Sequence, residues 1–177
     1  PHTPVQVTVD SASRIEELLL GHRLDFGLLE GNIHSGLLES CEFGSYRVGV
    51  FVSPDYPLGK PGTCGPEELL GHRLLLREAG SAVRDVFDHA LYGLGLTAEP
   101  ACISVNSQAL VRMAEKGLGA AVLPVPVAEP ALQAGTLREV AVTGLSMENR
   151  MKAAWIREKS MSPQMGRLLE LLKKCEG

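Results

Sequence analysis

The hydrophobic positions of this chain follow two different periods, and their succession predicts an α/β fold. Short segments rich in β-branched and other apolar residues predict strands, and between them apolar residues recur at helical spacing. The predicted strands are 5–9, 24–29, 37–43, 46–53, 74–77, 101–105, 119–123, 137–142 and 152–157. The predicted helices are 14–20, 66–70, 81–92, 107–116, 125–134 and 163–174. Strand, helix and strand in the first 30 residues are typical of the βαβ unit of a parallel sheet.

The starts and ends of several predicted helices carry capping signals. Ser13 and Glu16 have the spacing of a capping box, in which a serine and a glutamate three residues later bond each other's backbone N–H groups. Glycines follow the predicted helix ends at positions 21, 71, 93 and 117. Pro130 interrupts the predicted helix 125–134, which makes that helix the weakest of the set.

The pattern changes between residues 37 and 66, and this change predicts two subdomains. Segments 37–43 and 46–53 predict neighbouring strands joined at residues 44–45, and the Gly- and Pro-rich stretch 59–66 is typical of a linker or hinge. A second series of strands and helices begins at residue 73, and the strand around Trp155 leaves that series again. We therefore expect one subdomain from residues 1–53 plus 147–177 and another from residues 54–146.

The composition is that of a globular protein that does not bind nucleic acid through its own surface. Of the 177 residues 45% are apolar and 21% charged, so the chain can bury a substantial core. The net charge is −4, whereas a DNA-binding surface usually carries a basic patch. No apolar run reaches the roughly 20 residues that a membrane-spanning helix needs. No signal peptide opens the chain, which starts at Pro1 without an initiator Met, so we expect a cytoplasmic fragment or processed piece.

The four cysteines do not predict a metal site. Cys41, Cys64, Cys102 and Cys175 are widely spaced, without a C-x-x-C pair or a histidine at ligand spacing. In a secreted protein they could form two disulfides, but a chain of this length with a good core favours free thiols in a reducing cytosol. We expect neither a metal nor another cofactor.

The motifs of common enzyme classes are absent from the sequence. There is no G-x-S-x-G nucleophile elbow, no G-x-x-x-x-G-K-[ST] phosphate loop and no G-x-G-x-x-G run. The histidines are scattered, and no two carboxylates have a spacing that suggests paired acid–base work. The sequence therefore favours a binding module that is not an enzyme.

Three predicted helices begin with small polar residues directly after a predicted strand. These starts are Ser11 with Ser13, Ser81, and Asn106 with Ser107. In a parallel sheet such loops lie at the carboxyl ends of the strands, where ligands bind. Free N–H groups and the helix dipole attract small anions there. Plain helix capping is the alternative for each of them, because Ser and Asn are also common N-caps.

Four segments, in this order, resemble the effector-binding domain of LysR-type transcriptional regulators. They are residues 24–31 (LDFGLLEG), 50–58 (VFVSPDYPL), 76–84 (LREAGSAVR) and 117–124 (GLGAAVLP). Ser162-Pro163 at the start of the last helix also fits the family, so the resemblance covers essentially the whole chain. The chain has Ala79 and Ala82-Val83 where relatives carry Pro and Gly-Thr, so its effector is expected to differ.

The resemblance implies a fold like the type II periplasmic binding proteins, with two α/β subdomains and an effector cleft between them. It also implies that a DNA-binding helix-turn-helix, and the first strand and helix of the domain, should precede Pro1. The family's effector loops correspond to Ser11, Ala12, Ser13, Glu30, Gly31, Glu78, Gly80, Ser81, Arg84, Asn106 and Ser107. Homodimers in which helix 81–92 lies at the interface are a further implication.

The expected function is therefore effector sensing, with a small anion such as a carboxylate or an oxyanion as the ligand. Arg84 could reach that anion or pair with Glu78 or Asp88 on the surface. Glu30 and Glu78 would repel an anion unless they point away or accept a hydrogen bond from the ligand. The alternative function is a solute-binding protein or an enzyme on the same fold, because a fold does not fix a function.

Overall fold

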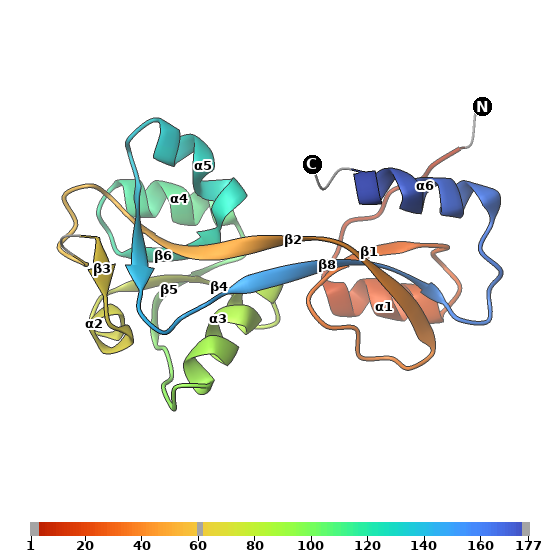
Figure 1. Ribbon diagram of the computed structural model, residues 1–177, viewed down its shortest axis with the longest axis horizontal. Coiled ribbons are helices and arrows are strands. Elements are labelled where there is room, and N and C mark those ends of the chain that lie inside the picture. Colours follow the sequence, from red (N-terminus) through yellow and green to blue (C-terminus); the bar gives the residue numbers. More distant parts are fainter. Residues whose placement is uncertain (1–3, 60–61, 175–177) are drawn as a thin grey trace. The chain divides into compact units, whose positions relative to one another are not determined.

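The structure is a computed structural model that describes residues 4–59 and 62–174 (Figure 1). Its helices are α1 (Ala12–Leu20), α2 (Pro66–Leu70), α3 (Ala82–Tyr92), α4 (Ser107–Glu115), α5 (Val125–Gln133) and α6 (Pro163–Lys174). Its strands are β1 (Gly27–Glu30), β2 (Leu38–Val52), β3 (Thr63–Cys64), β4 (Leu74–Arg77), β5 (Pro100–Ser104), β6 (Ala120–Pro124), β7 (Arg138–Val142) and β8 (Glu148–Ile156). The mixed α/β composition predicted from the two hydrophobic periods is confirmed.

The chain forms two units. Unit 1 comprises Pro1–Ser45 and Arg150–Gly177, and unit 2 comprises Tyr46–Asn149. The chain leaves unit 1 within the long strand β2 and returns to it within β8. Backbone pairing follows the order β1-β8-β2-β6-β4-β5. Strands β2 and β8 pair with each other, and each has residues in both units.

The sheet of unit 2 has parallel strands at its centre, as the second strand–helix series predicts. Strand β4 pairs in parallel with β5 and β6, while β2 pairs antiparallel with β6 and β7. The run Leu74-Leu75-Leu76 is buried on both faces of the sheet: Leu74 and Leu76 pack with Phe87 of α3, and Leu75 packs with Leu110 of α4. A continuous apolar run is what a strand covered by helices on both sides requires.

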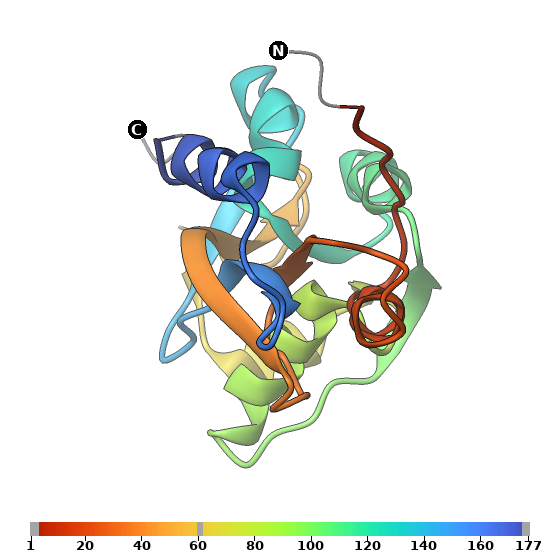
Figure 2. The ribbon, with the colours of Figure 1, turned by 90° about the vertical axis from the view of Figure 1, so that its right-hand side faces the viewer.

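Unit 1 is built on β1 and β8, which pair antiparallel with Leu29 opposite Lys152. Helix α1 and helix α6 lie on opposite sides of these strands (Figures 1 and 2). Alternate residues of β8 serve the two helices: Ala154 packs in the cluster of α1, and Trp155 packs in the cluster of α6, where its ring stacks on that of Phe26. This alternation follows from the two-residue period of a strand.

The prediction of a strand at residues 5–9 is wrong. The segment has no regular structure, and its valines face solvent, with Val9 91% exposed. Strand β1 pairs only with β8 among the described residues, and antiparallel, so the predicted parallel βαβ unit is not formed here. β-branched residues favour a strand only where a neighbouring strand accepts their backbone hydrogen bonds and covers their side chains.

Other boundaries differ from the sequence-based expectation for reasons of pairing. The predicted strands 37–43 and 46–53 form the single strand β2, because Gly44 and Ser45 continue extended where a turn was expected. Strand β1 begins at Gly27 and not at Leu24, and the short strand β3 lies inside the stretch expected to be a linker, where it pairs with β7. The predicted helix at 125–134 is confirmed as α5 despite Pro130.

The start of α1 also differs. Its N-cap is Ser11, whose hydroxyl accepts from the backbone N–H of Arg14, whereas Ser13 lies inside the helix. Glu16 forms no capping box, because its buried carboxylate accepts hydrogen bonds from the loop after β1. The free thiols predicted at Cys41, Cys64 and Cys102 are confirmed, and Cys175 lies outside the described residues. Burial raises the pKa of the Cys64 thiol, which keeps it protonated and unreactive near neutral pH.

Candidate functional site

The turn after β4 brings several predicted ligand-binding residues together in unit 2. Arg77 ends β4, Glu78 and Gly80 form the turn, and Ser81 is the N-cap residue of α3. The backbone N–H of Ser81 donates to the carbonyl oxygen of Glu78 over 3.2 Å and closes the turn. Gly80 has φ +83°, and a Cβ there would meet no atom within 4 Å. Glycine is therefore needed for the backbone conformation and not for space.

Ser81 is the most unusual polar residue of this turn. It is only 8% exposed, and its hydroxyl makes no capping hydrogen bond to α3. Within the described residues no other group bonds that hydroxyl either. This hydroxyl is therefore free to pair with a further group, as donor or acceptor. The open N–H groups of the first turn and the positive end of the helix dipole lie beside it, which is the arrangement that binds small anions.

Arg77 and Glu78 form a two-pronged ion pair next to Ser81. Nε and Nη2 of Arg77 each donate to one carboxylate oxygen of Glu78 over 2.8 Å, and both side chains are partly buried. The hydrogen bonds from Arg77 are the main reason why the pKa of Glu78 lies below its ordinary value. Glu78 therefore carries its negative charge at neutral pH, but a guanidinium neutralises it locally. The expected repulsion between Glu78 and an anion is removed by a residue that sequence reasoning missed.

Arg77 also connects this turn to the start of α4. Its Nη1 donates to the hydroxyl oxygen of Ser107 over 3.0 Å, so the predicted residues Glu78 and Ser107 are brought together through it. One signal in the sequence could have identified Arg77: it is a charged residue directly after the buried run Leu74–Leu76. That position is the carboxyl end of a parallel strand, where α/β proteins bind ligands.

Arg84 pairs with its own helix. Its Nε donates to Asp88 over 2.8 Å, one turn further along α3, and its Nη1 donates to the backbone carbonyl of Arg77 over 3.4 Å. Of the two roles expected for Arg84, the structure shows the ion pair with Asp88. The side chain is not on the surface, however, because it is only 13% exposed. Arg84 thus supports the turn and adds positive charge close to it.

Asn106 acts as an ordinary helix cap. Its side-chain oxygen accepts from the backbone N–H groups of Gln108 and Ala109, over 2.9 and 3.4 Å. These donors of α4 are therefore already satisfied, unlike those of α3. The hydroxyl of Ser104 also fixes the backbone of Asn106, donating to its carbonyl and accepting from its N–H. Of the two polar residues predicted at this helix start, Ser107 is the one whose side chain is not used for capping.

The other predicted residues belong to unit 1. Ser11 caps α1, and its hydroxyl lies 3.4 Å from that of Ser13, while Ala12 begins the helix. Glu30 ends β1, and Gly31 follows with φ +80°, its N–H donating to the carbonyl of Arg150 over 3.0 Å. The structure therefore brings Ser11 and Ser13 together at one helix start and Glu30 and Gly31 together at one strand end.

A buried carboxylate that was not predicted to be functional holds the loop after β1. Glu16 of α1 is 6% exposed, and its oxygens accept from the backbone N–H groups of His34 and Ser35 over 3.2 to 3.3 Å. Nδ1 of His34 lies 3.3 Å from Oε1 of the same carboxylate. Glu16 thereby fixes the loop that begins at Glu30 and Gly31. In the sequence Glu16 lies within an apolar helical pattern, which gives no sign of this role.

Residues 4–59 and 62–174 contain no group of three or more His, Cys, Asp or Glu side chains placed to hold a metal ion. In the same part of the chain, no helix is both long and apolar enough to cross a membrane. A surface hollow follows one side of α6, in unit 1, and involves none of the predicted ligand-binding residues. It is lined by Pro163, Gly166, Arg167, Glu170, Leu171 and Lys174.

Comparison with known proteins gives a consistent result. Residues 1–175 match the family model described as the LysR substrate binding domain. The chain is 32% identical over 173 residues to the uncharacterized HTH-type transcriptional regulator YeiE of Escherichia coli K12. That match covers 96% of this chain and 58% of the relative, so the chain spans little more than half the length of this regulator.

Solved structures show the same fold at low sequence identity. The regulatory domain of CcmR from Synechocystis PCC6803, in complex with 2-PG, matches with a TM-score of 0.85 at 16% identity, covering 98% of this chain and 83% of that domain. The effector binding domain of QuiR in complex with shikimate matches with a TM-score of 0.80 at 12% identity, covering 94% and 78%. The expected fold of the type II periplasmic binding proteins is confirmed by these neighbours.

Proposed function

The chain belongs to the LysR substrate-binding domain family, and from this premise we propose that it is the effector-sensing domain of a transcriptional regulator. We propose further that the start of α3 in unit 2 is the centre of its effector site. The effector would shift the population of conformations of the domain, and the rest of the regulator would respond to that shift. In this role the domain binds its ligand without transforming it.

The observation that carries this proposal is the difference between three helix starts. Ser11 caps α1 and Asn106 caps α4, so plain capping explains both. The hydroxyl of Ser81 caps nothing, although the residue is almost completely buried. A ligand that accepts hydrogen bonds would pair with this hydroxyl and with the N–H groups of the first turn of α3.

The charges around Ser81 favour a small anion as that ligand. Arg77 neutralises Glu78, and Arg84, which is paired with the half-exposed Asp88, adds a second guanidinium near the turn. The helix dipole contributes roughly half a positive charge at the same place. The complexes of CcmR with 2-PG and of QuiR with shikimate support a small ligand for this fold. Within unit 1 we propose Ser11, Ala12, Ser13, Glu30 and Gly31 as effector-binding residues.

We propose that the intact regulator is a cytoplasmic homodimer that binds DNA through a segment outside this chain. The acidic net charge of −4 and the relative's description as an HTH-type regulator support the proposal that DNA is bound outside this chain. Apolar side chains on and beside α3 and β5 support a contact between two copies: Tyr92 is 77% exposed and Val105 is 75% exposed. Light scattering tests this contact, since Val105→Glu should lower the average mass in solution, and an unchanged mass would contradict it.

The effector site is tested by isothermal titration with a panel of small acids: acetate, lactate, glycerate, shikimate, phosphate and sulfate. At least one of them should bind, and Ser81→Ala should weaken its binding about tenfold, since a hydrogen bond to a charged group contributes about 1.5–3 kcal/mol. The matched control is Ser160→Ala, because Ser160 is exposed and lies outside the proposed site. Binding that is insensitive to Ser81→Ala, or no binding by any of the acids, would refute the proposed site.

A further inference from the structure

The side chain of Arg77 lies between the two helix starts of unit 2. Its Nε and Nη2 hold both oxygens of Glu78, and its Nη1 donates to the hydroxyl oxygen of Ser107 over 3.0 Å. A guanidinium carries donors only, so in this contact the hydroxyl of Ser107 accepts. The direction of the hydrogen bond is therefore fixed by chemistry.

This direction determines what Ser107 can offer to a ligand. A serine hydroxyl has one proton and two lone pairs, and Arg77 occupies one lone pair. The proton must point elsewhere, and the hydroxyl donates it to no other described residue. A charged donor on the oxygen also polarises the O–H bond and strengthens its own donation. Ser107 is therefore prepared as a donor.

From these contacts we infer that Arg77 is a positioning residue: braced by Glu78, it orients the hydroxyl of Ser107 as a hydrogen-bond donor to an oxygen acceptor of the effector. This inference rests on the proposed function and deepens it, because it defines the ligand group at Ser107. That group is a carboxylate or oxyanion oxygen.

Glu78 has a defined part in this arrangement. A lone arginine side chain has many rotamers, and the double contact with Glu78 selects one of them. The adjacent position of Glu78 in the chain keeps the pair together when the site is empty. Glu78 thus fixes the orientation of the Arg77 guanidinium, and this guanidinium in turn orients the hydroxyl of Ser107 as a donor.

The test is a double-mutant cycle on the full chain with the acid of the panel that binds most tightly. Ser107→Ala and Arg77→Met should each weaken binding about tenfold or more. Because Arg77 acts through Ser107, the double variant should bind no more weakly than the weaker single variant. Arg77→Lys should lose affinity too, since an ammonium cannot hold Glu78 in two-pronged fashion and reach Ser107 at once. Arg112→Met, which removes an exposed guanidinium from α4, should leave affinity unchanged.

The outcomes separate the inference from the proposed function. Losses that add in the double variant would show that Arg77 acts on the ligand directly, and they would overturn the inference. Unchanged binding in Ser107→Ala with weakened binding in Ser81→Ala would overturn the inference and leave the proposed site intact. No binding by any acid would overturn both. If thermal unfolding shows that Arg77→Met does not fold, the same cycle run with Arg77→Lys and Ser107→Ala decides the question.

Discussion

The side-chain amide of Asn149 donates to the phenolic oxygen of Tyr46 over 2.6 Å. Asn149 is 1% exposed, and its oxygen Oδ1 is buried without a partner among the described residues. Among the described residues, the contact with Tyr46 is thus the hydrogen bond that holds the buried side-chain amide of Asn149, at the point where β2 and β8 enter unit 2. Such a group is sensitive to the loss of its remaining partner.

Removing that partner should destabilise the fold. We expect Tyr46→Phe to lower the free energy of unfolding by about 1–3 kcal/mol, because it leaves both ends of the buried amide without a partner. Urea denaturation followed by circular dichroism measures the change. The control is Tyr92→Phe, at an exposed tyrosine, which should have almost no effect. Equal effects of the two substitutions would contradict the prediction.

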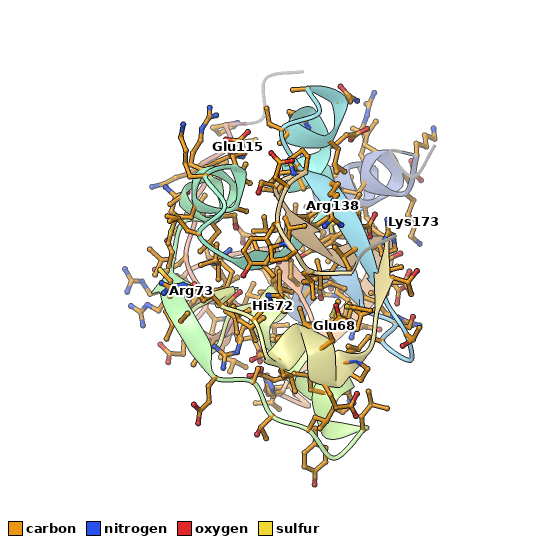
Figure 3. The ribbon with its side chains drawn as sticks, turned by 90° about the vertical axis from the view of Figure 1, so that its left-hand side faces the viewer. Glu68, His72, Arg73, Glu115, Arg138 and Lys173 are labelled. Atoms are coloured by element: carbon orange, nitrogen blue, oxygen red, sulfur yellow. The ribbon has the colours of Figure 1, made fainter. Side chains whose placement is uncertain are left out.

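Arg138 should hold the loop that follows β2. Its Nη2 donates to the carbonyls of Tyr56 and Leu58 over 2.7 Å, and its Nε donates to that of Pro54 (Figure 3). Arg138→Lys keeps the charge but loses the fork of donors, so we expect a loss of about 2 kcal/mol and faster hydrogen exchange at the Tyr56 amide.

The matched control for Arg138→Lys is Arg112→Lys, at an exposed arginine in an i,i+3 ion pair of α4. Surface ion pairs of this kind contribute little, so stability should change by less than about 0.5 kcal/mol. If exchange at Tyr56 is equally slow in both variants, the three carbonyl contacts do not hold the loop.

The carboxylate of Glu16 should be needed for the loop after β1. Glu16→Gln replaces one acceptor oxygen by an NH2 group, which cannot accept from the N–H groups of His34 and Ser35. We expect a loss of about 1–3 kcal/mol in chemical denaturation, reported by the fluorescence of Trp155 in the same unit. Glu17→Gln, at the exposed neighbour of Glu16, serves as the control and should be nearly neutral.

Glu115 should make stability depend on pH through Thr136. The hydroxyl of Thr136 donates to Glu115 over 2.6 Å and is the main reason why the pKa of Glu115 lies below its ordinary value of 4.5. A carboxyl whose pKa is lower in the folded state stabilises the protein above its unfolded-state pKa. That contribution disappears as the pH falls through the folded-state value.

Thr136→Val should therefore destabilise the protein by about 0.5–1.5 kcal/mol near neutral pH and by less in acid. Thermal unfolding at a series of values between about pH 7 and about pH 3 measures this difference. A destabilisation that stays constant or grows towards low pH would show that Thr136 acts through packing and not through the ionised carboxylate.

The sequence predicted those parts of the molecule that depend on local pattern. The helices at 81–92 and 125–134 form because apolar residues recur at helical spacing, and the run Leu74–Leu76 forms a doubly covered strand because every residue in it is apolar. The capping box predicted at Ser13 does not form, because the carboxylate of Glu16 accepts hydrogen bonds from the loop after β1. The strand predicted at residues 5–9 does not form, because a strand needs a neighbouring strand to pair with. The local sequence pattern does not show whether such a neighbour is present.

The site shows the same division more clearly. Residue type alone marked Ser81, Asn106 and Ser107 as polar helix starts, and the family motifs marked Glu78, Gly80 and Arg84. Only the tertiary structure distinguished Asn106, which caps its helix, from Ser81, whose hydroxyl caps nothing. Only the tertiary structure shows that Arg77 contacts Ser107, thirty positions further along the chain. The contact forms because parallel pairing of β4 with β5 places Arg77 opposite Ser104. Hydrogen bonds act over about 3 Å in space, and the sequence orders residues along the chain alone.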